Sequence, residues 1–172
     1  MNVLFYMATA FVLLLVKTSL LMPWPVVARL FNPFLIMTVY LGLFRPGITY
    51  AAVAVFLGYL ADIFSGSRFG FHVIVSSAIY YITSILRGRF FLESRFFQGV
   101  YLAAMSLLHA FVGSAVFSLM GSDAPSSYLY DEIIGRMALN GVLGVFLFAW
   151  MRKTEQRWAP LSERKSAGIS LD

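Results

Sequence analysis

The sequence predicts an all-α, polytopic membrane protein with about six transmembrane helices. Hydrophobic residues make up 60% of the 172 residues and charged residues only 12%, and the mean hydropathy is +0.80. This composition leaves too little polar surface for a soluble globular protein. Apolar stretches of nearly membrane length also recur between short polar or proline-containing breaks, and at roughly 20 residues per crossing the chain can cross about six times. We therefore expect one integral membrane helical domain over 1–151 and a basic cytoplasmic tail over 152–172.

The first helix is expected over about 3–22. Pro23-Trp24-Pro25 ends it, because proline disfavours a continuing helix and tryptophan suits the membrane interface. No basic segment and no small-residue cleavage pattern precede Lys17, so the sequence favours a retained helix over a cleaved signal peptide. The ammonium group of Lys17 is expected to reach the outer interface.

The second helix, over about 30–44, is short. About 15 residues rise only ~22 Å, against a hydrocarbon core of ~30 Å. Either this helix begins nearer Val26, with the Arg29 side chain reaching the interface, or it does not fully cross the membrane. Asn32 and Pro33 form a suitable N-cap and first helical residue, and they favour the shorter helix.

The later apolar stretches predict four further helices. Arg45-Pro46-Gly47 separates them from the second helix. We expect them at about 48–64, 69–86, 96–119 and 129–151. The polar segment that follows alternates Lys or Arg with Glu, which is typical of a frayed or lipid-surface segment.

Basic residues predict which helix ends face the cytoplasm. One group lies between the fourth and fifth helices and another follows the sixth: Arg87, Arg89 and Arg95, then Arg152, Lys153, Arg157, Arg164 and Lys165. The positive-inside rule places both groups, and with them the C-terminus, in the cytoplasm. The loop over 121–132 carries three acidic residues and no Lys or Arg, so it should face outward. Six crossings put the N-terminus inside, whereas a second helix that does not cross would reverse it.

The net charge of +5 does not require a nucleic-acid partner. Nine of the thirteen Lys and Arg residues, namely Arg45 and the two groups above, lie on the predicted cytoplasmic side. Membrane topology and contact with anionic lipid headgroups account for them there. We therefore expect membrane lipids, and no nucleic acid, among the partners.

An enzymatic function is disfavoured by the residues that the chain lacks. It contains no His-Glu-x-x-His zinc motif, no Gly-x-Ser-x-Gly elbow and no cysteine, and its two histidines fall on different predicted helices. Its four glutamates lie in loops, in the tail or at a helix end, so none can pair with Asp62 inside the membrane. We expect no catalytic, cofactor-binding or metal-binding residues and no cofactor.

Asp62 lies near the C-terminal end of the third helix. An ionisable group costs at least ~2.5 kcal/mol at the centre of a membrane helix, and the helix dipole at this end disfavours an anion. A cation or hydrogen-bond donor should compensate, and Arg68 and His72 are the nearest candidates. Gly66 and Gly70 allow a tight reversal between the third and fourth helices. The simplest interpretation is that Asp62 ties this turn together; the alternatives are a ligand-binding or proton-coupling carboxylate and a partner contact.

Arg136 and His109 are further ionisable groups predicted inside the membrane. Arg136 lies on the same helix face as Glu132, four residues earlier, and this pair would lower the cost of the buried arginine. The alternative is that Arg136 faces a cavity or a partner carboxylate. His109 is expected to be a hydrogen-bonded core residue rather than a ligand. Small residues nearby predict close helix packing: Ser106, Ala110 and Gly113 on the fifth helix, and Asn140, Gly141 and Gly144 on the sixth.

Three segments carry a family resemblance: Phe44-Arg45-Pro46-Gly47, Gly58-Tyr59-Leu60-Ala61-Asp62-Ile63-Phe64-Ser65-Gly66 and Phe69-Gly70-Phe71-His72. They resemble the signature region of the MreD family of bacterial rod shape-determining membrane proteins, and the size and basic cytoplasmic ends are similar as well. The positions that match the family pattern are taken as fold- and interface-determining. With Arg68 and Arg136, the candidate structural or interface residues are Gly58, Asp62, Gly66, Arg68, Gly70, His72 and Arg136.

The resemblance implies a non-enzymatic, multi-pass scaffold subunit of the bacterial inner (cytoplasmic) membrane that acts in peptidoglycan synthesis and cell shape. It also implies a complex, the elongasome, in which the single-span protein MreC is the direct partner. Through MreC, the implied complex includes the MreB filament, the SEDS glycosyltransferase and a class B penicillin-binding protein.

A second function class follows from architecture, because MreD-like chains are similar to the substrate-binding S-components of energy-coupling-factor transporters. These are six-helix bundles with a cavity. A small-molecule-binding transport subunit would need a polar cavity lined by Asp62, Arg136 or His109. The few polar groups in the membrane interior argue against it, whereas docking a partner's transmembrane helix needs only small residues and shape.

Overall fold

The computed structural model describes residues 3–20, 23–65, 70–87, 94–119 and 126–167, and these segments are helical almost throughout, with no strand. The predicted all-α class is confirmed for them. The helices are α1 (Val3–Leu15), the π-helical turn η1 (Val16–Leu20), α2 (Pro25–Leu30), α3 (Pro33–Phe44), α4 (Ile48–Ser65), α5 (Phe71–Leu86), α6 (Arg95–Leu119) and α7 (Ser126–Ala167).

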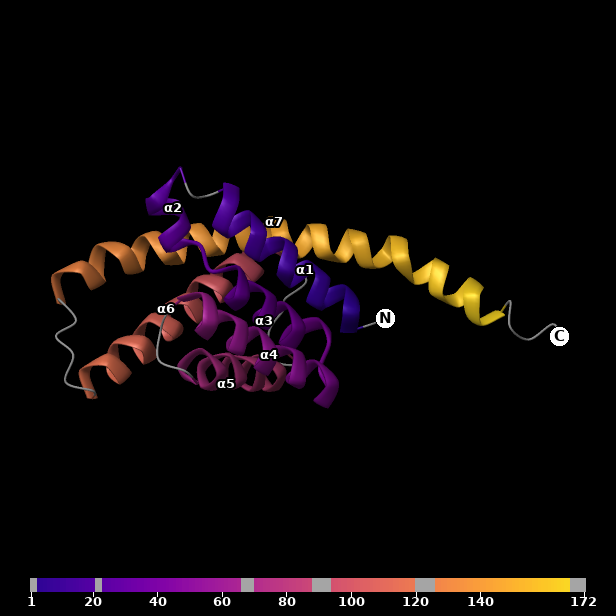
Figure 1. The fold of residues 1–172 in the computed structure, drawn as a ribbon, viewed down its shortest axis with the longest axis horizontal. Helices are drawn as coiled ribbons and strands as arrows, with labels where there is room; N and C mark the ends of the chain where they lie inside the picture. The colour runs from indigo at the N-terminus through magenta and orange to yellow at the C-terminus, as the bar shows by residue number, and fades with distance from the viewer. Residues whose placement is uncertain (1–2, 21–22, 66–69, 88–93, 120–125, 168–172) are drawn as a thin grey trace.

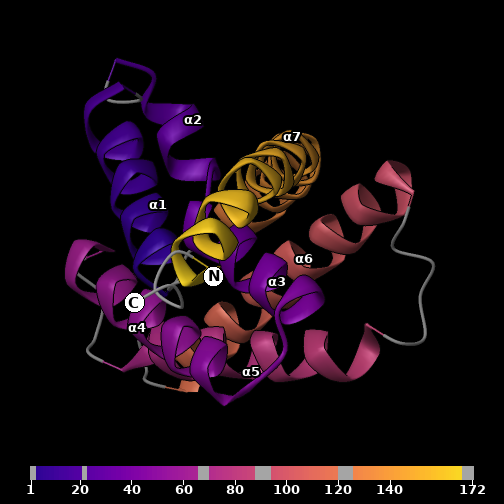
Figure 2. The same ribbon diagram turned by 90° about the vertical axis from the view of Figure 1, so that its right-hand side faces the viewer.

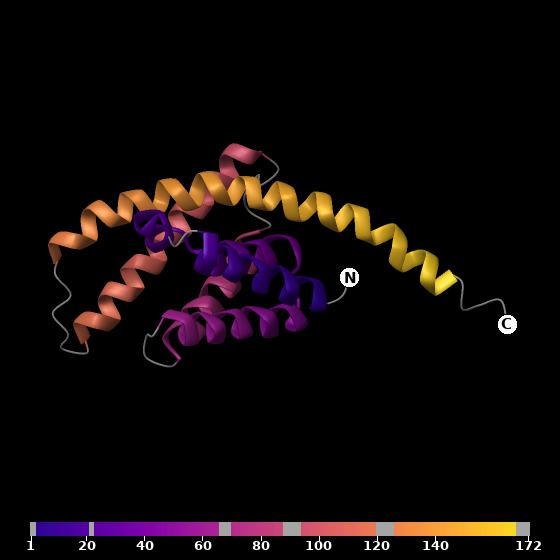
Figure 3. The same ribbon diagram turned by 45° about the horizontal axis from the view of Figure 1, so that its top comes forward.

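The longest helix, α7, runs along the whole molecule. Figure 1 shows its C-terminal turns projecting beyond the other helices, and Figure 3 shows that it is gently bowed. In the end-on view of Figure 2, α1 and α2 lie on one flank of α7 and α6 on the other, with α3, α4 and α5 beneath. Two pairs of consecutive helices pack most extensively, α4 with α5 and α6 with α7.

The hydrophobic core surrounds α3, in which every residue from Pro33 to Leu43 is buried. This helix contacts α1, α4, α5, α6 and α7. Its sequence shows no alternation of apolar and polar faces, as is typical of a helix that is buried all round. At 12 residues it is ~18 Å long, so protein rather than lipid surrounds a helix that is short for a bilayer.

The start of α3 confirms the predicted cap. Asn32 is the N-cap, and its side-chain oxygen accepts a hydrogen bond from the backbone N–H of Leu35 at 3.2 Å. Pro33 occupies the first turn, where its missing N–H leaves no unsatisfied donor. The cap explains why the helix begins here and not at the earlier Val26.

The structure adds α2, a short helix that precedes α3 and is separated from it by extended backbone at Phe31. Asn140 of α7, only 1% exposed, bridges this break. Its side-chain oxygen accepts from the backbone N–H of Asn32 at 2.9 Å, and its amide donates to the carbonyl of Leu30 at 3.2 Å. Non-helical backbone at membrane depth needs such partners, so Asn140 holds together the two parts of one interrupted helical segment.

The predicted helix boundaries fare differently at the two ends of the chain. The first helix, expected over about 3–22, is helical from Val3 to Leu20: α1 ends at Leu15 and continues as the π-helical turn that carries Lys17, and residues 21 and 22 lie outside the described residues. The last helix does not end at 151 but continues to Ala167. Residues 152–157 are mostly Arg, Lys, Glu and Gln, which are strong helix formers, so the change from apolar to polar sequence does not end the helix.

Two segments of the described chain, Arg95–Val112 and Ile133–Arg157, are long and apolar enough to cross a membrane by themselves. The helices α1, α3, α4 and α5 are apolar but shorter. Large hydrophobic side chains on the outside of the bundle, including Phe11, Ile74 and Ile85, are exposed, as expected where helices face lipid tails. Six crossings stay a prediction.

Candidate functional site

Asp62 joins the end of α4 to the start of α5. Its carboxylate is 1% exposed and accepts hydrogen bonds from the backbone N–H of Gly70 at 2.8 Å and from that of His72 at 2.9 Å. The Nδ1 atom of His72 lies 2.9 Å from the same carboxylate oxygen that the His72 amide binds. We call Asp62, Gly70 and His72 the Asp62 clamp.

The clamp resolves the electrostatic problem that the sequence posed for Asp62. The carboxylate lies at the unfavourable C-terminal end of α4, but it caps the N-terminus of α5, where backbone N–H groups and the helix dipole favour an anion. Gly70 is the N-cap residue of α5 with φ of +97°, a left-handed conformation that glycine adopts without strain. Among the described residues, the donors include two backbone amides and the imidazole, while Arg68 and Gly66 lie outside the described residues.

Gly58 allows α4 and α5 to touch one turn before the clamp. A Cβ atom at Gly58 would lie 2.6 Å from both the carbonyl oxygen of His72 and the Cα atom of Val73. Because both neighbours are backbone atoms, no side-chain rotation would relieve the clash. The close approach of α4 to the start of α5 is therefore at Gly58, one of the candidate fold-determining residues.

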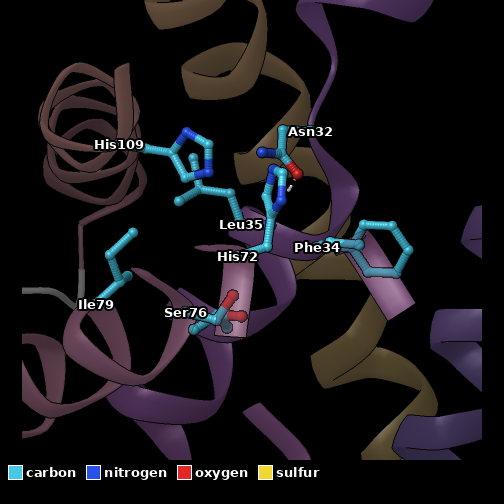
Figure 4. A pocket seen from close by; sticks show the side chains of 9 residues that line it. Asn32, Phe34, Leu35, His72, Ser76, Ile79 and His109 are labelled. Carbon is cyan, nitrogen blue, oxygen red and sulfur yellow. Dashed lines mark hydrogen bonds between the residues drawn. The ribbon is translucent and has the colours of Figure 1, made fainter. Parts of the chain in front are cut away.

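A small cavity lined by both polar and apolar side chains lies beside the clamp, among α3, α4, α5 and α6 (Figure 4). The rings of His72 and His109 lie side by side with their centroids 5.8 Å apart. The side chains of Asn32, Ser76 and Thr38 contribute further polar groups to the lining, and the Thr38 hydroxyl has no hydrogen-bond partner among the described residues. The sequence predicts a hydrogen-bonded core residue at His109, and the structure brings its ring beside that of His72.

The volume of this cavity limits what it can bind. It is about 10 Å³, close to the space of a single water molecule and far below the roughly 300–1,000 Å³ of small-molecule pockets. Of the three residues that a transport subunit would be expected to place in its cavity, His109 lines this one. The arrangement therefore does not favour the transport-subunit alternative.

A second buried carboxylate, Glu155, lies toward the other end of the bundle. It is 8% exposed and accepts a hydrogen bond from the hydroxyl of Tyr6 at 2.5 Å. Its other oxygen accepts from the guanidinium of Arg45 at 3.2 Å. We call Tyr6, Arg45 and Glu155 the Glu155 cluster. It joins α1, the residue that caps the C-terminus of α3, and α7.

Aromatic residues surround the Glu155 cluster. The ring of Tyr6 packs edge-on against Tyr50 of α4, with centroids 5.6 Å apart, and the guanidinium of Arg152 lies 5.1 Å from the centroid of the Phe44 ring. Tyr80 of α5 donates to the carbonyl of Gly47 at 2.9 Å and accepts from its N–H at 3.0 Å. The turn between α3 and α4 is therefore held by the neighbouring helices.

The sequence prediction missed Glu155 because it placed this residue in a polar tail. A periodic signal was present: Phe148, Met151 and Glu155 recur at helical spacing, and all three are buried on α7. Arg136, in turn, is half-buried on α7, and the side chain of its predicted partner Glu132 lies outside the described residues. Within the described residues, no three His, Asp or Glu side chains gather closely enough to hold a metal ion.

These features define a class of protein: an all-helical membrane protein whose buried carboxylates bind one helix to another. The chain belongs to the MreD family, because the family model described as rod shape-determining protein MreD matches residues 1–154. The match covers the clamp and ends one residue before Glu155. Neither a search of curated proteins nor a search of solved structures found a match. Family membership assigns the chain to rod shape determination and to the membrane, and the likeness to S-components stays a prediction.

Proposed function

We propose that this chain is a non-enzymatic scaffold of the bacterial cell-elongation complex, and that it docks the transmembrane helix of a single-span, MreC-like partner on the exposed face of α4. Membership of the MreD family supports a role in cell shape. The two buried carboxylates hold helices together, and the cavity beside the clamp is too small for a substrate. In the part of the chain that the structure describes, these interior features hold helices together, and the proposed docking surface lies on the outside of the bundle.

The proposed docking surface is the α4 stripe, formed by Phe56, Tyr59 and Ile63. These residues recur at spacings of three and four, so they share one face of the helix. They are 36%, 50% and 46% exposed, respectively. The opposite face of α4, with Leu57, Ala61 and Asp62, is buried against the bundle.

Tyr59 is the observation that carries this proposal. Its hydroxyl has no hydrogen-bond partner among the described residues. Tyr59 lies six positions before the end of α4, nearly two helical turns from that end. Side chains on a helix tilt toward its N-terminus, so Tyr59 leans away from the nearer membrane surface and into the hydrocarbon. A phenolic hydroxyl facing lipid tails is costly, and a polar group on a docked helix would remove that cost.

The proposed place of this chain in a larger complex follows from the docking of the partner's helix. The partner's single helix would pack along α4, and through the partner the chain would join MreB, the SEDS glycosyltransferase and the class B penicillin-binding protein. The proposal includes six crossings of the inner membrane, with α2 and α3 together forming one crossing, and a cytoplasmic C-terminus.

Affinity purification in mild detergent tests the docking surface. We expect wild-type protein to co-purify with the MreC-like partner, and Tyr59→Phe to weaken that complex by about three- to twentyfold, the range of one hydrogen bond between membrane helices. Tyr81→Phe on α5 is the matched control, because Tyr81 is exposed to a similar degree, 57%. Equal loss in both variants, or in neither, would remove the α4 stripe from the proposal.

Cross-linking locates the partner independently. The chain has no cysteine, so Ile63→Cys introduces a single thiol on the α4 stripe. We expect it to form a disulfide with a cysteine placed in the partner's transmembrane helix, whereas Ile85→Cys on the exposed face of α5 should not. Recovery of an ATPase pair and a coupling subunit in place of the partner would favour the transport-subunit function.

A further inference from the structure

Two adjoining hollows lie between α6 and α7, and they differ sharply in chemistry. The basic hollow, of about 470 Å³, is lined by Arg95, Arg152 and Lys153 together with Gln98 and Gln156. The apolar groove, of about 350 Å³, is lined by residues such as Phe96, Val100, Ala103, Ala138 and Val142. Arg95 and Val145 line both, so the two hollows are continuous.

The basic hollow has the features of a phosphate site. Arg95 is the first residue of α6, a helix of 25 residues, and the N-terminus of a helix attracts anions through its free N–H groups and its dipole. Arg152 is held by its contact with the ring of Phe44, 5.1 Å away. Among the described residues, no acidic side chain lines either hollow. Three cations with no acidic neighbour in the described lining favour a ligand with a net negative charge.

The apolar groove begins where the cations end. It is open along the outer surface of α6 and α7, and the small side chains of Ala103 and Ala138 leave space between larger residues. The cations belong to the groups that the positive-inside rule places at the cytoplasmic surface, so the groove runs from the headgroup level toward the membrane centre. A charged head and an apolar tail are the two halves of a lipid.

We propose that α6 and α7 form a binding site for an anionic glycerophospholipid of the phosphatidylglycerol type, with its phosphate in the basic hollow and an acyl chain in the apolar groove. Basic pockets between transmembrane helices on the cytoplasmic side bind anionic headgroups. A zwitterionic lipid would bring an ammonium group into a hollow that already holds three cations, so phosphatidylethanolamine should bind less well. The site is formed by residues of α6 and α7 and by none of α4. It therefore does not depend on the docking proposal.

Native mass spectrometry of the full chain, with phosphatidylglycerol or phosphatidylethanolamine of identical acyl chains, tests the headgroup. We expect the double variant Arg152→Gln/Lys153→Gln to weaken phosphatidylglycerol binding by about thirtyfold. This is the sum of the usual contributions of two Lys or Arg side chains near an anionic membrane surface. The matched control is Arg87→Gln/Arg157→Gln, which removes two exposed cations from the same predicted side but outside the hollow. Equal affinity for both lipids, or an equal loss in the control, would overturn the headgroup assignment.

A second pair of variants tests the groove without changing charge. Ala138→Trp fills it, whereas Ala104→Trp adds the same bulk to an exposed position of α6 outside it. We expect the first to displace phosphatidylglycerol and the second to retain it, with both variants monodisperse and equally stable to heat. Retention in Ala138→Trp would overturn the acyl-chain site, and stronger binding of a polyprenyl phosphate than of phosphatidylglycerol would overturn the choice of lipid.

Discussion

The Asp62 clamp and the Glu155 cluster both use a buried carboxylate that accepts hydrogen bonds. They differ in how far apart in the sequence the joined residues lie. In each, a buried carboxylate on one helix accepts hydrogen bonds from residues of another part of the bundle. The clamp joins positions eight and ten residues apart, whereas the cluster joins Glu155 to positions 110 and 149 residues away. The clamp can therefore form within one helical pair, and the cluster only after the first and last helices meet.

The difference extends to the donors. The clamp uses backbone amides that every sequence has, together with one imidazole. The cluster uses two specific side chains, the guanidinium of Arg45 and the hydroxyl of Tyr6. Loss of the clamp carboxylate leaves helix-terminal N–H groups without an acceptor, while loss of Glu155 leaves Tyr6 buried and Arg45, whose side chain is 36% exposed, able to reach water.

Asp62→Ala should therefore have the largest effect. We expect it to lower the free energy of unfolding by about 3–5 kcal/mol, the range for breaking a buried charged network by removing one partner. Asp62→Asn, which keeps one acceptor oxygen, should insert normally but lose part of this stability, and with it part of its accumulation and partner assembly. The measurement is unfolding in mixed micelles of mild detergent and dodecyl sulfate, followed by circular dichroism. Wild-type stability of Asp62→Ala would contradict a holding role for the clamp.

Glu155→Ala should cost less, about 2 kcal/mol, because the penalty falls mainly on the buried hydroxyl of Tyr6. Glu155→Gln keeps an acceptor for Tyr6 and should lose about half as much. Hydrogen exchange of the backbone amides distinguishes the two regions: exchange should rise in α1 and the inner part of α7 and stay unchanged in α4 and α5. Faster exchange around Asp62 in this variant would show that the two regions are coupled.

The same contrast explains what could be predicted from the sequence. The Asn32–Pro33 cap, the extents of α4, α5 and α6, and the contact of Asp62 with His72 depend on residues close together in the chain, so local sequence patterns can predict them. The break before α3, held by Asn140, and the partners of Glu155 depend on residues more than a hundred positions apart. Helical periodicity could have marked Glu155 as buried, but no local pattern names Tyr6 or Arg45 as its partners.

Thr38→Val should have the smallest effect and supplies the reference for both carboxylates. Thr38 is fully buried in α3 beside the cavity, yet its hydroxyl has no hydrogen-bond partner among the described residues. Replacing an unpaired buried hydroxyl by an apolar group of the same shape is nearly neutral or slightly stabilising, within about 1 kcal/mol. The same micelle unfolding measurement applies. A loss of stability as large as that of Glu155→Ala would mean that the Thr38 hydroxyl is hydrogen-bonded, for example by a water molecule in the cavity. The polar groups around His72 and His109 would then form a third network that stabilises the bundle, between the clamp and α3.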